Sequence, residues 1–154
     1  MKKNVLCMWL GVSCLLMATP LTANLYIEEP LLFGTIIIRD NTIPGSVTVP
    51  AYGHPSSSGG VLILEPGRPA ELIFSDYPPY IELTITPMLP VQTSVVSGDT
   101  EQFTLGNIDL PKSIITDSTG VAKVKMGGTL KTSGAGGYYL NTEYKAVFYL
   151  DVTY

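Results

Sequence analysis

Apolar residues recur at every second position through most of this sequence, and glycine or proline interrupts almost every such run. A period of two places apolar side chains on one face of a β-strand. Beyond residue 23, no segment of useful length carries the 3.6-residue period of an amphipathic helix. The pattern therefore predicts an all-β fold.

Eight segments have the length and composition of strands. They cover residues 31–38, 45–49, 60–65, 70–74, 80–86, 103–110, 121–130 and a final run from about 138 to 154. Turn-forming residues separate them: the side chains of Asp40 and Asn41 readily bond their own backbone, and Gly120 suits a positive φ. Short strands at intervals of roughly ten residues predict an antiparallel β-sandwich or barrel of about seven to nine strands.

The final run, GYYLNTEYKAVFYLDVTY, is the most regular of these segments. Its even-numbered positions are almost all apolar, and a continuous strand from Tyr144 to Tyr154 would extend roughly 33 Å. An apolar face of that length needs a cover, because an exposed one promotes aggregation. The candidate assembly strand consists of Tyr144, Ala146, Phe148, Leu150, Val152 and Tyr154.

The first 23 residues have the layout of a cleaved signal peptide. Lys2 and Lys3 precede an apolar run, and small and polar residues follow it. The run is shorter than the roughly 20 residues of a membrane span, which argues against an anchor. We expect cleavage after Ala23, with Ala18 as the alternative, and a single β-sandwich domain over residues 24–154.

Both cysteines, Cys7 and Cys14, lie in this leader. The mature chain would then have no thiol for a disulfide, a metal site or a nucleophile. Lipid attachment at Cys14 is an alternative, but the preceding GVS lacks the large aliphatic residue of a lipoprotein cleavage site.

The net charge of the mature chain bears on whether it binds nucleic acids or anionic membranes. Without Lys2 and Lys3, seven basic residues stand against thirteen acidic ones, a net charge of −6. Nucleic acids and anionic membrane surfaces repel such a chain. We expect no nucleic-acid partner, no membrane span in the mature chain, and a location in the periplasm, at the cell surface or outside the cell.

Residues that would support catalysis or metal binding are sparse. His54 lies in the loop YGHPSSSGG, where neighbouring serines cannot form a rigid nucleophile–base pair, and the G-x-S-x-G motif is absent. The acidic pairs Glu28/Glu29 and Asp99/Glu101 lack the dense oxygen ligands of a calcium loop. We therefore predict a protein that is not an enzyme and binds no metal or cofactor.

Two further motifs have both a functional and a packing interpretation. Tyr77 and Tyr80 in DYPPYIEL form a candidate aromatic rim that could stack on sugars, although tyrosines at strand ends more often pack against the fold. Gly127 and Gly128 in MGGTL lack the strand-to-helix context of a phosphate-binding loop. They indicate a bulge or a close backbone approach.

Several segments together resemble a bacterial family, the domain-of-unknown-function 4402 family (DUF4402). The resemblance rests on PLLFGTIII, GSVTV, RPAELIFS, AKVKMGGTL and the final run, and it covers residues 30–154. Arg68 replaces the usual small residue before Pro-Ala, and the final run has bulkier aromatic residues than is typical. The resemblance implies an exported immunoglobulin-like β-sandwich with no established activity. The final run is also similar, more loosely, to the closing strand of spore-coat-U-like pilins of archaic chaperone–usher systems.

These features favour an exported structural surface protein, a pilus or fimbria-like subunit that assembles by β-strand addition. In that mode an extended segment of one chain completes the sheet of another. The candidate donor segment presents Leu25, Ile27, Leu31 and Phe33 on one face, and Glu29 interrupts that face. The expected partners are a second copy of the chain or a periplasmic chaperone. The alternative is a self-complete secreted binding module for a glycan or an envelope component.

Overall fold

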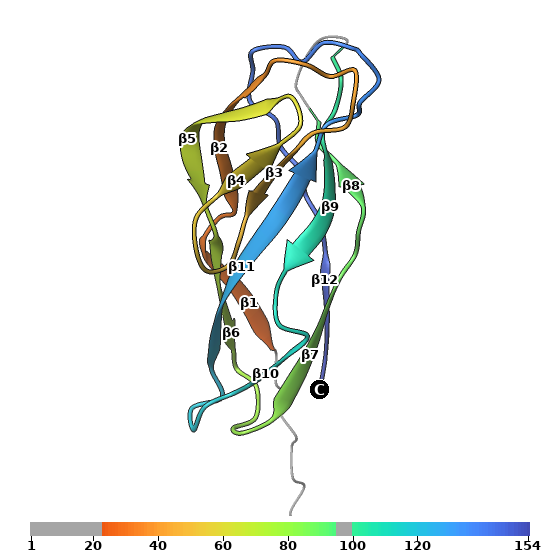
Figure 1. The fold of residues 1–154 in the computed structure, drawn as a ribbon. Helices are drawn as coiled ribbons and strands as arrows, with labels where there is room; N and C mark the ends of the chain where they lie inside the picture. Colours follow the sequence, from red (N-terminus) through yellow and green to blue (C-terminus); the bar gives the residue numbers. More distant parts are fainter. Residues whose placement is uncertain (1–22, 95–99) are drawn as a thin grey trace, which may run out of the picture.

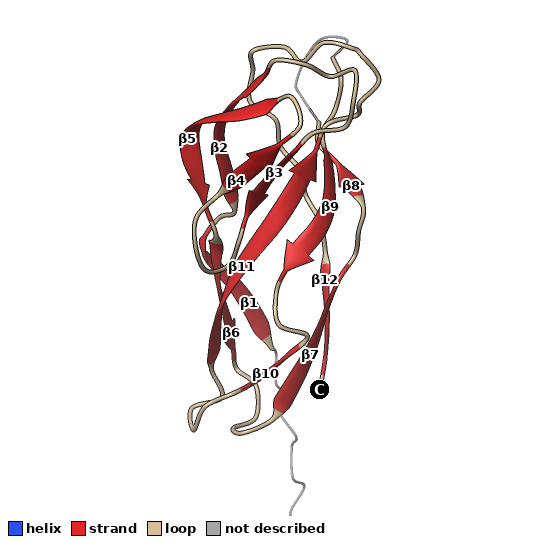
Figure 2. Ribbon diagram, viewed as in Figure 1, coloured by secondary structure: helices blue, strands red, loops and turns tan. Residues whose placement is uncertain are grey.

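The computed structural model describes residues 23–94 and 100–154, and these residues form antiparallel β-sheets with no helix (Figures 1 and 2). Twelve strands lie in the described part of the chain. They are β1 (Asn24–Glu29), β2 (Leu32–Ile38), β3 (Ser46–Val49), β4 (Ser56–Ser58), β5 (Val61–Arg68), β6 (Ala70–Ser75), β7 (Glu82–Pro87), β8 (Val91–Gln92), β9 (Thr104–Asp109), β10 (Ser113–Ile115), β11 (Ala122–Lys131) and β12 (Leu150–Thr153).

The largest sheet is organised around β11. It runs in the order β1-β6-β11-β3-β4, with β9 on the other side of β11 and β8 beyond β9. A second sheet has the order β10-β7-β12, and β2 pairs with β5 in a separate two-stranded sheet. Figure 1 shows these sheets as two layers of an elongated sandwich, with β2 and β5 near one end and β7, β10 and β12 toward the other.

Two apolar cores lie between the layers. Core 1 is built around Leu72, Phe74 and Leu83, from β6 and β7, and β12 packs against it. Core 2 contains Phe103 and Leu130, and residues from β2 and β5 pack against it. Phe148 and Ile108 contact both cores, which joins the two halves of the sandwich.

The predicted all-β sandwich is confirmed, and each of the eight predicted segments overlaps one strand. Four strands were not expected: β1, β4, β8 and β10. The predicted strand from Tyr138 to Tyr154 is wrong in extent, because regular pairing is confined to Leu150–Thr153. The predicted signal peptide lies almost wholly in residues 1–22, outside the described residues.

β11 pairs with both β6 and β3 along the same edge, and Gly127 lies where one pairing ends and the other begins. Residues 122–126 of β11 pair with β6, and residues 128–131 pair with β3. A Cβ atom at Gly127 would stand 2.3 Å from the carbonyl oxygen of Val49 and 2.4 Å from the nitrogen of Ala51. The predicted close backbone approach is confirmed, and only glycine fits where the pairing passes from one strand to the next.

Two aspartates close turns, of which the sequence indicated only Asp40. Asp40 accepts a hydrogen bond from the nitrogen of Thr42 at 2.8 Å, and Asp117 accepts one from the nitrogen of Thr119 at 2.7 Å. The bond from the Thr42 nitrogen lowers the pKa of Asp40, and the bond from the Thr119 hydroxyl lowers that of Asp117, because each favours the carboxylate form. No helix in residues 23–94 or 100–154 is long and apolar enough to cross a membrane.

Candidate functional site: an open groove beside the closing segment

The closing segment, residues 138–154, runs along the sandwich with one paired edge. Lys145 exchanges two backbone hydrogen bonds with Ser94, at 2.7 and 3.1 Å, and the carbonyl of Tyr149 accepts one from Met88 at 2.9 Å. From Leu150 onward the segment forms β12 and pairs with β7. The closing segment is therefore held to the rest of its layer at a few points before it becomes a regular strand.

Its side chains follow the predicted alternation over most of the segment. Tyr144, Phe148, Leu150 and Val152 are half-buried, and the odd-numbered residues from 143 to 153 are exposed. Ala146 and Tyr154 depart from this pattern, since both are exposed. At these two positions the apolar side of the closing segment remains largely open to solvent.

An aromatic cluster fixes the first half of the closing segment. The ring of Tyr139 stacks on Phe103 with centroids 4.3 Å apart, and Tyr144 meets Phe103 edge-on at 4.9 Å. The Tyr144 hydroxyl lies 2.9 Å from the hydroxyl of Thr100 and donates to the carbonyl of Leu140 at 3.1 Å. The sequence shows these aromatic residues but not that Phe103, about 40 positions earlier, receives them.

Asn41 ties the loop after β2 to the start of the closing segment. Its side chain donates to the carbonyl of Gly137 and to the hydroxyl of Ser133, both at 3.0 Å, and accepts from the nitrogen of Gly134 at 3.0 Å. Asn41 is buried, so these bonds satisfy an amide that could not be left unpaired. Sequence reasoning predicted a local turn residue here and missed this long-range role.

A groove lies between β2 and the closing segment. Its volume is about 1370 Å³, and residues 31–42 form one wall and residues 136–148 the other. Phe103, Leu105 and Leu130 of core 2 also line it. We call this feature the strand groove.

Both walls of the strand groove present backbone without a partner strand. Among the described residues, β2 pairs with β5 along one edge, and no strand pairs with its other edge. On the other wall, Lys145 and Tyr149 direct their bonded backbone groups away from the groove, toward Ser94 and Met88. Because alternate residues of an extended chain direct their backbone groups to opposite edges, Tyr144, Ala146 and Phe148 face the groove with theirs.

The predicted donor residues are divided between two strands. Leu25 and Ile27 lie in β1, which pairs with β6 of the same sandwich, and both side chains are exposed. Leu31 packs against core 1, and Phe33, in β2, packs against core 2. The four residues therefore do not form one face of a free segment.

The two predicted rim tyrosines have opposite environments. Tyr77 is 8% exposed and packs edge-on against Tyr154, with centroids 5.3 Å apart, whereas Tyr80 is 72% exposed. Burial raises the pKa of the Tyr77 phenol, and the neighbouring Tyr154 hydroxyl adds to the rise. Tyr77 has no open face for a sugar, so the pair does not form a stacking platform.

The loop histidine and serines that sequence analysis weighed for catalysis lie at the surface. His54 is exposed in a loop, and Ser58 bonds the hydroxyl of Ser46 at 2.8 Å. No group of three or more histidine, cysteine, aspartate or glutamate residues within ranges 23–94 and 100–154 is placed to hold a metal ion.

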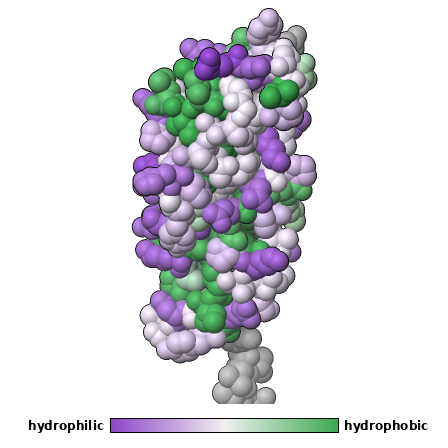
Figure 3. Space-filling view, in the orientation of Figure 1, coloured by the Kyte–Doolittle hydropathy of each residue, from purple (hydrophilic) through white to green (hydrophobic). Residues whose placement is uncertain are grey.

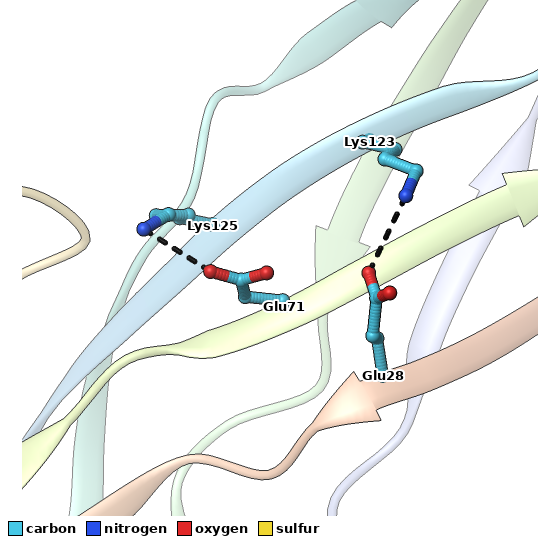
Figure 4. A network of polar contacts seen from close by, with 4 residues as sticks. All are labelled: Glu28, Glu71, Lys123 and Lys125. Atoms are coloured by element: carbon cyan, nitrogen blue, oxygen red, sulfur yellow. Dashed lines mark hydrogen bonds and ion pairs between the residues drawn. The ribbon is translucent and has the colours of Figure 1, made fainter.

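The outer face of the largest sheet carries a ladder of opposite charges (Figure 4). Lys125 of β11 pairs with Glu71 of β6 at 3.1 Å, and Lys123 reaches across β6 to Glu28 of β1 at 3.5 Å. These residues and Tyr52 line a small pocket of about 270 Å³. The side chains are partly exposed, so each pair contributes roughly 1 kcal/mol or less to stability.

Exposed apolar side chains gather at the end of the sandwich that holds β2 and β5. Ile37 and Leu62 are cross-strand partners there, and both they and Leu64 are exposed. Figure 3 shows a green patch at the upper left of the face, and further green areas lie lower on the same face. Ile37 and Leu64 also line the strand groove, so the groove borders these exposed apolar side chains.

Comparison with known families assigns the chain to one of them. The model of a domain of unknown function, DUF4402, matches residues 25–154. The chain belongs to the DUF4402 family. No curated protein and no solved structure matches the chain, and the likeness to spore-coat-U-like pilins remains a prediction.

Proposed function

We propose that this DUF4402 protein is an exported, non-catalytic structural subunit of a surface assembly, pilin-like in its mode of association. Its strand groove takes up an extended segment of a partner polypeptide by β-strand addition. The observation that carries the proposal is a pair of backbone edges, on either side of an apolar floor, that have no partner strand among the described residues.

The chemistry of the groove walls selects the class of occupant. Unpaired N–H and C=O groups at strand spacing are satisfied along their length by another extended backbone. A sugar or a helix does not present backbone groups at that spacing on both sides. The occupant is therefore an extended polypeptide whose alternate side chains fill the apolar floor.

The alternative function, a self-complete glycan-binding module, has weaker support. It relied on Tyr77 and Tyr80, and Tyr77 is buried. Tyr80 alone offers one exposed ring. The open groove also argues against a self-complete sandwich.

A strand probe tests the acceptor role. The probe is a fluorescent peptide of eight alternating valine and threonine residues, flanked by lysines for solubility, titrated with the full chain and followed by anisotropy. We expect saturable binding that weakens at least about tenfold in Ala146→Arg, because the exposed Ala146 lines the groove and an arginine there obstructs the site.

The matched control is Ala135→Arg, which places the same side chain at an exposed position outside the groove lining. Binding equal to that of the unmodified chain is expected for this variant. Absence of probe binding, or equal binding by both variants, would show that the groove does not accept strands.

A further inference from the structure

We infer that the occupant of the strand groove is β1 of a second copy of the same chain, inserted parallel to β2. This inference rests on the proposed acceptor role of the groove and names its partner.

The way β1 is held makes it exchangeable. It is the edge strand of its sheet, and it pairs with β6 in a ladder whose register shifts between Ile27 and Glu29. Leu25 and Ile27 are 40% and 66% exposed, so β1 adds little side-chain packing to its own sandwich. Its ion pairs, Glu28 with Lys123 and Glu29 with Arg68, lie at the surface.

Transfer to the strand groove would bury what β1 now exposes. The six residues of β1 and the seven of β2 extend to similar lengths of roughly 20 Å. Leu25 and Ile27 share one face of β1, and they would meet the floor formed by Phe103 and Leu105. The backbone bonds that β1 loses from β6 are replaced by bonds to both groove walls.

Pro30 marks the hinge. Proline has no N–H to continue a ladder, and it separates β1 from β2 in the chain. Leu31 and Phe33, on the other side of Pro30, are anchored in the two cores. β1 can therefore leave while β2 stays in place.

Charge sets the direction of insertion. β2 and the closing segment run in opposite directions along the groove, so an inserted strand is parallel to one and antiparallel to the other (Figure 1). Arg39 lies at the end of β2, lines the groove, and forms no ion pair with any described residue. Insertion parallel to β2 brings Glu29 to Arg39, whereas the reverse direction brings Asn24 there.

A peptide with the sequence of residues 23–30, ANLYIEEP, tests this inference by anisotropy against the full chain. We expect saturable binding that Ala146→Arg weakens at least about tenfold and Ala135→Arg leaves unchanged. The peptide could instead replace the chain's own β1 on β6, and Ala146→Arg would not affect that binding. A loss of binding in Ala146→Arg therefore shows that the peptide lies in the groove.

Direction is tested by charge exchange. Arg39→Glu in the protein should weaken binding of the native peptide roughly threefold to tenfold, and Glu29→Arg in the peptide should restore it. Failure of the exchanged pair to recover affinity would exclude the parallel orientation.

Association of the full chain supplies the second measurement. Light scattering across a concentration series should show oligomers that disappear in Leu25→Asp/Ile27→Asp and persist in Ile115→Asp, whose target is 68% exposed in β10. Binding of the valine–threonine probe without binding of the β1 peptide would leave the acceptor role intact and show that another polypeptide is the occupant. Binding of neither would overturn both proposals.

Discussion

Gly120 joins β10 to β11 through a turn that accepts no side chain. Its φ is +77°, and a Cβ atom there would stand 1.9 Å from the carbonyl oxygen of Tyr77. Gly136 has a similar φ of +79°, but a Cβ atom there would have no neighbour within 4 Å. Alanine at position 136 would therefore introduce backbone strain alone, whereas alanine at position 120 would add a steric overlap.

We expect Gly136→Ala to lower the free energy of unfolding by about 1 kcal/mol, the usual cost of a left-handed alanine. Gly120→Ala should cost more than about 3 kcal/mol, because the overlap with backbone cannot relax through a rotamer. Urea denaturation of both variants checks the difference. Equal losses would contradict the close contact with Tyr77.

The turn at Asp117 predicts a dependence of stability on acid pH. The folded pKa of Asp117 lies below its unfolded value, so its stabilising contribution is present above about pH 4 and is lost as the pH falls through the lowered value. Asp117→Asn should melt slightly lower than the unmodified chain at pH 7, and the difference should vanish near pH 2. Melting curves followed by circular dichroism between these values test it, with exposed Ser118→Ala as the control. A constant difference across the range would contradict the assignment.

At the scale of elements, the closing segment combines strand-like packing with sparse pairing. Phe148 contacts both cores, whereas its neighbour Tyr149 is 70% exposed. Phe148→Ala should lower the free energy of unfolding by about 2 kcal/mol, since the ring is only half-buried. Tyr149→Ala should change it by less than about 0.5 kcal/mol. Chemical denaturation compares the two, and similar losses would mean that the alternation has no energetic consequence.

The elements that sequence predicted and those it missed differ in a physical way. Strands such as β6 and β11 carry alternating apolar residues that reach a core, and that period is visible without a structure. β4 consists of three exposed serines that pair with β3 through the backbone, so no apolar pattern marks it. A period of two predicts which face of a strand is buried, but it does not show where a partner strand exists. For that reason the strand predicted from Tyr138 was too long.

The candidate site was predictable in part. The final run was singled out as an assembly strand, and Leu31 and Phe33 as part of a donor segment; residues from both regions line opposite walls of the strand groove. Nothing local indicates that they lie opposite each other, since residues 31–42 and 136–148 are about a hundred positions apart. The pairing of β1 with β6 was also missed, because the exposed side chains of β1 give no burial pattern.

At the scale of the whole molecule, the sandwich is closed around core 1 and open beside core 2. β11 pairs along both edges and runs between the two cores, while β2 and residues 144–148 have one free edge among the described residues. Protection of backbone amides should follow this division.

Hydrogen exchange should be slowest in β11 and fast at the groove-facing amides of Ala146 and Phe148. Raising the protein concentration into the range where oligomers form should slow exchange at these two positions and leave exchange in β11 unchanged. Mass spectrometry of digested samples measures both. Concentration-independent exchange at the groove, with oligomers present, would place the contact elsewhere.

β1 and the strand groove lie on different parts of the molecule, and a contact between them is heterologous rather than two-fold. If each copy gives β1 and receives one, the first subunit of a series keeps a vacant groove and the last keeps an unused β1. The two ends of such a polymer are chemically distinct, so it can lengthen by different reactions at each end. A soluble peptide of the β1 sequence would then stop growth at one end only, by capping the vacant groove.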